Sequence, residues 1–143
     1  MFQNDYLMRI ILQFIAALQR AMRDHNIRYD EKAGDLEQLV GEVVNIDPRL
    51  LFSLAPESLV SMLMIGDFDE QIGGYVLRSI YLEADILEEA GLTERANLRR
   101  AQADAIAEAY GFDVSPADIK AETLEEYLEE QARLYDPEYQ EQP

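Results

Sequence analysis

Apolar residues recur every three or four positions along almost the whole chain, and no useful stretch alternates between apolar and polar residues with a period of two. In the first segment, Leu7, Ile11, Phe14 and Leu18 share one face of a helix that starts at residue 4 or 5 and ends at Met22. β-Strands would require apolar and polar residues to alternate with a period of two. We therefore predict an all-α fold, an array of six or seven antiparallel helices.

Proline, glycine and capping residues divide the rest of the chain. Asp47 and Pro48 predict a helix start, because Asp caps a helix and Pro fits its first position. Gly91 and Gly111 predict helix ends, since glycine adopts the left-handed conformation found there. The predicted helices begin at residue 30 or 35 and end at 44, then cover 48–54, 58–65, residue 67 or 69 to 90, 94–110 and 123–135, with a short turn after Ser115.

Three further positions carry local predictions. Thr93 is expected to cap the helix that follows Gly91, and Thr123 with Glu126 matches a capping box. The pair Gly73-Gly74 disfavours a helix interior, so it predicts either a close helix approach or a delayed helix start.

Small residues mark the hairpin formed by the helices on either side of Gly91. Ala84, Ala96 and Ala103 fall where two antiparallel helices press together, with Leu87 at a large apolar position. Residues 84–103 thus resemble a tetratricopeptide repeat. That resemblance implies a tetratricopeptide-like superhelix, and the alternative is an irregular bundle.

The opening residues MFQNDYLMR, together with the chain length, are similar to a family of short bacterial all-helical proteins of unknown function. This resemblance implies a helical fold and supplies no activity. We assign no residue to a catalytic, cofactor-binding or metal site on its basis.

The length of 143 residues fits one domain, which is expected to span 1–135, followed by a flexible acidic tail over 136–143. The chain has no cysteine, which excludes disulfides, a thiolate nucleophile and a thiolate zinc site. No cofactor is expected.

The net charge is -17, and it is uneven. The first 34 residues hold five Lys or Arg against four acids, so the remainder carries almost all of the negative charge. Such a surface repels nucleic acid and anionic membranes, and it suits a protein or peptide partner with a basic surface. The longest apolar run, residues 10–18, is too short to span a bilayer, and the N-terminus lacks the basic start of a signal peptide. A cytoplasmic location is expected.

His25 is the only histidine and the only candidate for a neutral-pH base. A hydrolase reading would combine it with Asp24 and a serine, although no serine lies in a Gly-x-Ser-x-Gly elbow. Asp67, Asp69 and Gln71 begin like a calcium loop, whose later required residues are missing.

The charged and aromatic clusters each have a structural interpretation as well as a functional one. Arg95, Arg99 and Arg100 are expected to pair with nearby acids rather than bind nucleic acid. The acids between Glu122 and Glu130 are expected to form a solvated helix face. The tyrosines of the second half are expected in the core or at its edge, with an exposed aromatic groove as the alternative: Tyr75, Tyr81, Tyr110, Tyr127, Tyr135 and Tyr139.

The leading functional hypothesis is a non-enzymatic module that offers a groove beside the hairpin of residues 75–110 to a protein or peptide. One alternative is a homodimer that associates through the first helix, by Leu7, Ile11, Phe14 and Leu18, because this helix is apolar around much of its circumference. The other is a hydrolase that uses His25 with a carboxylate.

Overall fold

The computed structural model describes residues 2–66 and 68–140, with side chains for 5–66 and 68–138. The fold is all-α, as predicted, and the described residues contain no strand. The elements are α1 (Phe2–Arg23), α2 (Tyr29–Val44), α3 (Pro48–Leu51), α4 (Pro56–Ile65), η1 (Glu70–Ile72), α5 (Gly73–Glu89), α6 (Thr93–Tyr110), η2 (Pro116–Ile119), α7 (Ala121–Tyr135) and α8 (Pro137–Gln140).

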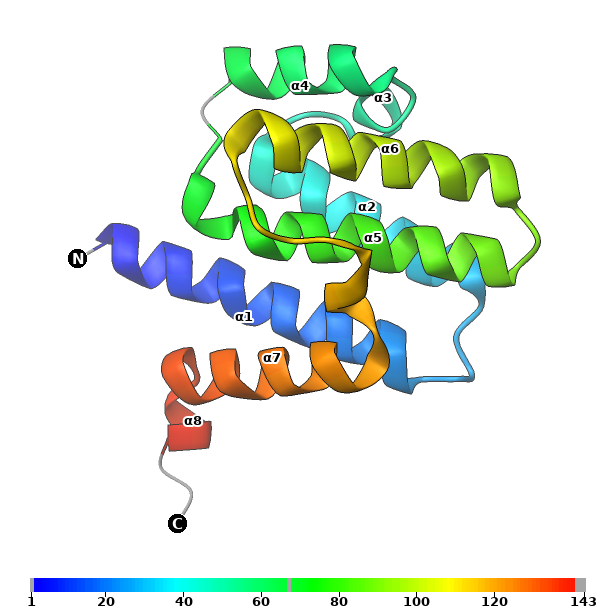
Figure 1. The fold of residues 1–143 in the computed structure, drawn as a ribbon. Helices are drawn as coiled ribbons and strands as arrows, with labels where there is room; N and C mark the ends of the chain where they lie inside the picture. Colours follow the sequence, from blue (N-terminus) through cyan, green and yellow to red (C-terminus); the bar gives the residue numbers. More distant parts are fainter. Residues whose placement is uncertain (1, 67, 141–143) are drawn as a thin grey trace.

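Helix α5 lies at the centre of the molecule, and α1, α2 and α6 pack around it (Figure 1). Its apolar residues are buried on several sides at once, and even Ser79 and Glu83 are buried. Helices α5 and α6 form the predicted antiparallel hairpin, in which Ala84, Ala96 and Ala103 are fully buried. Small side chains at these positions allow the two helix axes to approach closely.

The first and the last long helices are neighbours in space. α7 packs along α1, although about a hundred residues separate them in sequence (Figure 1). A solenoid brings each unit into contact only with the next unit along the chain. The contact between α1 and α7 therefore belongs to an irregular bundle, one of the two predicted architectures.

Several predicted helix boundaries are confirmed. Asp47 accepts a hydrogen bond from the backbone N–H of Arg49, and Ser115 caps η2 in the same way through Ala117. Gly91 and Gly111 have φ values of 85° and 74°, in the left-handed region where glycine is favoured. Both glycines end a helix, as predicted.

Two predicted caps are wrong. Thr93 is the first residue of α6, whose flanking residue Leu92 makes no side-chain capping bond. α7 begins at Ala121, so Thr123 lies inside its first turn and the capping box with Glu126 does not form. Tertiary contacts of Leu92 and the end of η2 fix these two starts instead.

The Gly73-Gly74 pair marks a delayed helix start, one of the two predicted alternatives, and the close approach at Gly73 is to an aromatic ring outside any helix. α5 starts only at Gly73, after the 3₁₀ turn η1 that Asp69 caps. A Cβ atom on Gly73 would lie 2.2 Å from Cζ of Phe112, so the glycine admits the aromatic ring of the segment after α6. The absence of a side chain at residue 73 thus allows the hairpin end to close over α5.

Helix α1 is covered by the fold itself. Ile11, Phe14 and Leu18 are buried, and the Phe14 ring stacks on Tyr75 of α5 at 5.8 Å between centroids. The face predicted to bind a second copy of the chain therefore belongs to the core of one copy, which corrects the residues assigned to that interface. In the expected tail, Pro137–Gln140 form the short helix α8, and residues 141–143 lie outside the described part.

Candidate functional site: two surface hollows and a buried arginine

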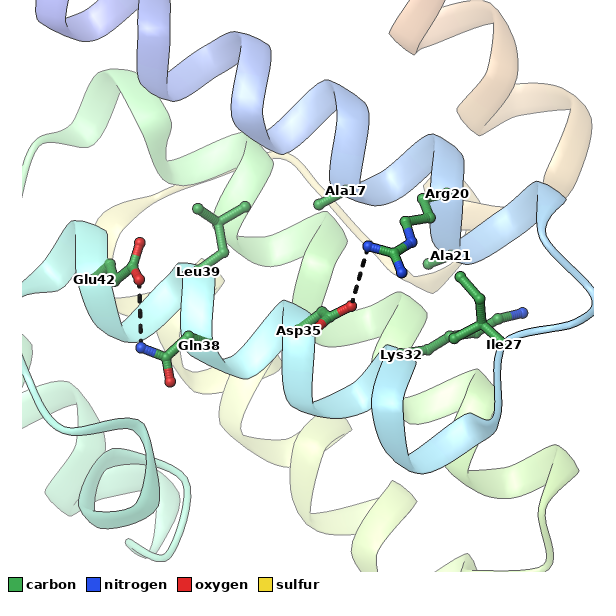
Figure 2. A pocket seen from close by; sticks show the side chains of 9 residues that line it. All are labelled: Ala17, Arg20, Ala21, Ile27, Lys32, Asp35, Gln38, Leu39 and Glu42. Carbon is green, nitrogen blue, oxygen red and sulfur yellow. Dashed lines mark hydrogen bonds and ion pairs between the residues drawn. The ribbon is translucent and has the colours of Figure 1, made fainter.

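A shallow hollow of about 260 Å³ lies between α1 and α2 (Figure 2). Ala17 and Ala21 of α1 and Leu39 of α2 provide its apolar wall, and Ile27 contributes from the loop between the helices. Polar side chains form the rest of the lining: Arg20, Lys32, Asp35, Gln38 and Glu42. The hollow can therefore accommodate an apolar group surrounded by side chains of both charges.

The charges around this hollow already interact with one another. Arg20 reaches across from α1 and lies 3.8 Å from Asp35 and 3.6 Å from Glu31 of α2 (Figure 2 shows the first pair). All three side chains are more than half exposed, so these ion pairs contribute little to stability. The rim can therefore rearrange at small cost, but it offers no strongly polarised group.

The second hollow, of about 300 Å³, lies on the outside of α4. It follows one helical stripe, Ser58, Ser61, Met62 and Ile65, with Glu57 at its start; we call these five residues the α4 outer face. Ile65 is 89% exposed, and Met64 beside it is 56% exposed. An exposed apolar strip of this kind marks a candidate contact surface.

A buried cluster connects four parts of the fold through Arg99 of α6. Its Nε donates to Oε2 of Glu83 in α5 at 3.2 Å, and its Nη2 donates to Oε2 of Glu37 in α2 at 3.0 Å. Its Nη1 donates to the Phe52 carbonyl at 3.0 Å and to Gln102 Oε1 at 3.2 Å. We call Arg99, Glu83, Glu37 and Gln102 the Arg99 cluster.

The Arg99 cluster also fixes the chain between α3 and α4. Gln102 donates through Nε2 to the carbonyls of Phe52 and Leu54, at 3.1 and 2.9 Å. The Arg99 guanidinium lies over the Phe52 ring at 4.8 Å. Buried backbone acceptors need such partners, so α4 is positioned by α6 side chains.

Glu83 is unusual because its side chain is only 1% exposed. Burial raises the pKa of Glu83 well above the usual range, and the hydrogen bond and charge of Glu37 raise it further, while Arg99 opposes the shift. A second carboxylate close by disfavours the charged form of a buried carboxyl group. Raised carboxyl pKa values occur in active sites, but here every group of the cluster is used to join helices.

A second guanidinium, that of the partly buried Arg78 in α5, has an aromatic partner. Its Cζ lies 3.5 Å from the centre of the Tyr127 ring of α7, and its Nη1 donates to the Gly74 carbonyl. Its buried Nε has no hydrogen-bond partner among the described residues. Tyr75 donates to Gln131 nearby at 2.6 Å, so these contacts tie α5 to α7.

The residues of the hydrolase hypothesis are not brought together around His25. His25 is exposed in the loop after α1, and Asp24 accepts a hydrogen bond from the backbone N–H of Asn26. The hollow beside His25 is lined by Ala16, Gln19, Arg20, Arg23, Asp24 and Asn26, which include no serine. The hydroxyl groups of Ser53 and Ser79 donate to carbonyls of their own helices or turns.

The calcium-like segment serves another purpose. Asp69 Oδ1 accepts from the backbone N–H of Gln71 and so caps η1, while Asp67 lies outside the described residues. Within residues 2–66 and 68–140, no three His, Asp or Glu side chains are grouped to hold a metal ion.

The expected intramolecular pairing of arginines is confirmed for two of the three. Arg99 lies in its buried cluster, and Arg100 contacts Asp85 at 3.1 Å and Glu88 at 2.8 Å. Arg95 is exposed. The acids of α7 are mostly solvated, as predicted, with Glu125 drawn to Arg23 of α1 at 3.1 Å.

The tyrosines lie in the core or at its edge. Tyr75 and Tyr81 are buried, and Tyr81 donates to Asp104 at 2.6 Å. Burial raises the pKa values of both hydroxyls. Tyr110 packs edge-on against Phe68. Their rings therefore do not form the exposed groove given as an alternative; the side chain of Tyr139 lies outside the described part.

Sequence reasoning missed the Arg99 cluster and the α4 outer face. The spacing Ala96, Arg99, Ala103 places the arginine on the buried stripe of α6, a signal available from periodicity. The apolar residues between Leu59 and Ile65 cover more of the helix circumference than one buried stripe needs. This pattern indicates an exposed apolar surface.

Comparison with known proteins found no match to a family model, to a curated protein or to a solved structure. The helices of the described part include none that is both long enough and apolar enough to cross a membrane.

Proposed function

We propose that this chain is a non-enzymatic binding module for a protein or peptide with a basic surface. The observation that carries the proposal is that many Lys and Arg side chains are already held in ion pairs within the chain. Among the residues that the structure describes, at least six Lys and Arg side chains form ion pairs with acids of the same chain: Arg20, Arg23, Arg28, Arg49, Arg99 and Arg100. Because the chain has 29 acids against 12 Lys and Arg, carboxylates stay in large excess on the surface.

A surface with this excess attracts cations over the whole molecule and speeds their encounter with it. Most of α5 is buried, so this proposal places the binding surface on the outer faces of the bundle instead of in a groove beside the hairpin of residues 75–110. A cytoplasmic location is part of this proposal. The alternatives, a dimer through α1 and a hydrolase at His25, gain no support from where their residues lie.

The test is capture of proteins from a cell lysate on the immobilised chain, with stepwise elution by salt. The matched control is a chain of identical composition in scrambled order, which has the same charge and no fold. We expect basic proteins that the folded chain retains, the scrambled chain does not, and salt releases. An empty eluate at low salt, or the same proteins on both chains, would contradict the proposal.

A further inference from the structure

The most apolar stretch of the chain lies at the edge of the molecule. Helix α4 packs on α6 through Leu59 and Leu63, and these are its only buried residues (Figure 1). Met64 and Ile65 are exposed, and Val60 and Met62 are only partly covered. A helix that is apolar around its circumference is normally covered on more than one side.

The α4 outer face has a shape suited to a second helix. Ser58 and Ser61 are small and lie one turn apart, next to the larger Met62 and Ile65. Small residues on one helix let the ridge of another approach, and the larger ones supply apolar contact. The stripe from Ser58 to Ile65 is about 10 Å long, roughly two turns of a partner helix.

Negative charge lies at both ends of this face. Glu57 stands at the start of α4, and its last turn contains no basic residue to balance the negative end of the helix dipole. Phe68, just after α4, packs on Tyr110 of α6 at 5.0 Å between ring centres, so the end of α4 lies near the end of α6. Both α4 and α6 end on the same side of the molecule (Figure 1).

These charges argue against a second copy of the chain as the occupant. An antiparallel pair of α4 helices would bring Glu57 of each copy toward the negative end of the other copy's helix dipole, and a parallel pair would bring the two Glu57 side chains together. Each copy also carries a net charge of -17. Like charges facing each other oppose association.

We infer that the α4 outer face binds an amphipathic helix of a partner protein, with Leu-like side chains toward Met62 and Ile65 and Lys or Arg residues toward Glu57 and the carbonyl end of α4. This rests on the proposed function and gives it a location. The apolar side chains supply affinity, and the charges at the two ends orient the partner helix.

The probe for the test is a designed Leu/Lys peptide of about four helical turns, labelled for fluorescence anisotropy, with a Leu/Glu peptide of the same pattern as its negative control. In the unchanged chain, the Leu/Lys peptide should bind and the Leu/Glu peptide should not. Ile65→Ser should raise the Kd about tenfold or more, as loss of a central apolar contact does.

Two matched variants make the test specific. Leu50→Ser removes an apolar side chain that is 49% exposed on α3, outside the α4 outer face, and should leave the Kd within about twofold. Glu57→Gln should weaken peptide binding and make it less dependent on salt. Glu126→Gln, the same charge change on α7, should have the smaller effect.

Equal effects of Ile65→Ser and Leu50→Ser, or of Glu57→Gln and Glu126→Gln, would overturn the α4 site. So would a dimer in sedimentation equilibrium that Ile65→Ser dissociates, because the occupant would then be a second copy. The proposed function and the α4 site can be tested separately. If a captured lysate protein binds the Ile65→Ser chain as tightly as the unchanged chain, the binding module stands and the α4 site is wrong.

Discussion

Helices α4 and α5 show that apolar content and burial are separate properties. α4 is the more apolar of the two, yet only Leu59 and Leu63 are buried. α5 contains Ser79, Glu83 and Gly73 and is nevertheless buried along most of its length. A helix is buried by how many neighbours pack against it, and α5 has α1, α2 and α6, whereas α4 has mainly α6.

Polar side chains make the difference in burial between α4 and α5 possible. Glu83 can be buried in α5 because Arg99 reaches it from α6 and also holds the chain before α4. The same arginine therefore fixes the centre of the molecule and positions the helix at its edge. An apolar centre alone would not specify where α4 lies.

The largest effect is expected from removing that arginine. Arg99→Met leaves the buried Glu83 and the partly exposed Glu37 without their cation, which should lower the free energy of unfolding by about 3–5 kcal/mol. Arg100→Met is the matched control: its partners Asp85 and Glu88 are about half exposed, and about 1 kcal/mol or less should be lost. Urea denaturation measures both; equal losses would show that the cluster is not special.

Two adjacent residues of α4 test the contrast within one helix. Leu63→Ala empties a buried position and should cost about 2–5 kcal/mol, whereas Met64→Ala changes an exposed one and should stay within about 0.5 kcal/mol. The measurement is again the midpoint and slope of urea denaturation. A large loss from Met64→Ala would mean that the outer side of α4 is covered in solution.

Two glycines should respond to alanine with opposite signs. Gly73→Ala forces a Cβ against the Phe112 ring and should cost about 1–3 kcal/mol. Gly34→Ala, within α2 and with no atom inside 4 Å of the new Cβ, should gain up to about 1 kcal/mol. Thermal unfolding of each variant tests this, and Phe112→Leu should reduce the loss at Gly73 if the ring is its cause.

The smallest effect is expected from Glu83→Gln, because Gln keeps the shape of the side chain. This variant tests the raised pKa of Glu83. The folded state keeps the Glu83 proton at pH values where the unfolded chain has lost it, so stability should fall as pH rises from the usual carboxyl pKa toward the raised one. Glu83→Gln should abolish this fall. Urea denaturation at successive pH values measures it.

The control for the pH series is Glu88→Gln, an exposed carboxylate on the same helix. It should leave the fall in stability with rising pH in place. A fall that survives in Glu83→Gln would assign the proton to another group.

Local signals in the sequence predicted the elements well where the backbone itself decides. Gly91, Gly111 and the pair Asp47-Pro48 bounded helices correctly, because φ preference and capping act within a few residues. Thr93 and Thr123 failed as caps, because residues packed before them had already started their helices.

The candidate site depended on distant contacts, and the sequence pointed to it only weakly. Arg99 looked like one of three surface arginines, and its burial required partners that lie 16 and 62 positions away. The apolar face of α1 suited a second copy as well as it suited α5 and α7.

By itself, then, the sequence determined the helices, the tight hairpin at Gly91 and the strongly negative charge, because spacing, glycine conformation and ionisable groups are properties of short segments. The tertiary structure decided which apolar faces meet. It placed α1 between α7 and α5, buried Arg99 and left one side of α4 exposed. Burial depends on residues far apart in the chain, and periodicity cannot say which of two equally apolar faces will be covered.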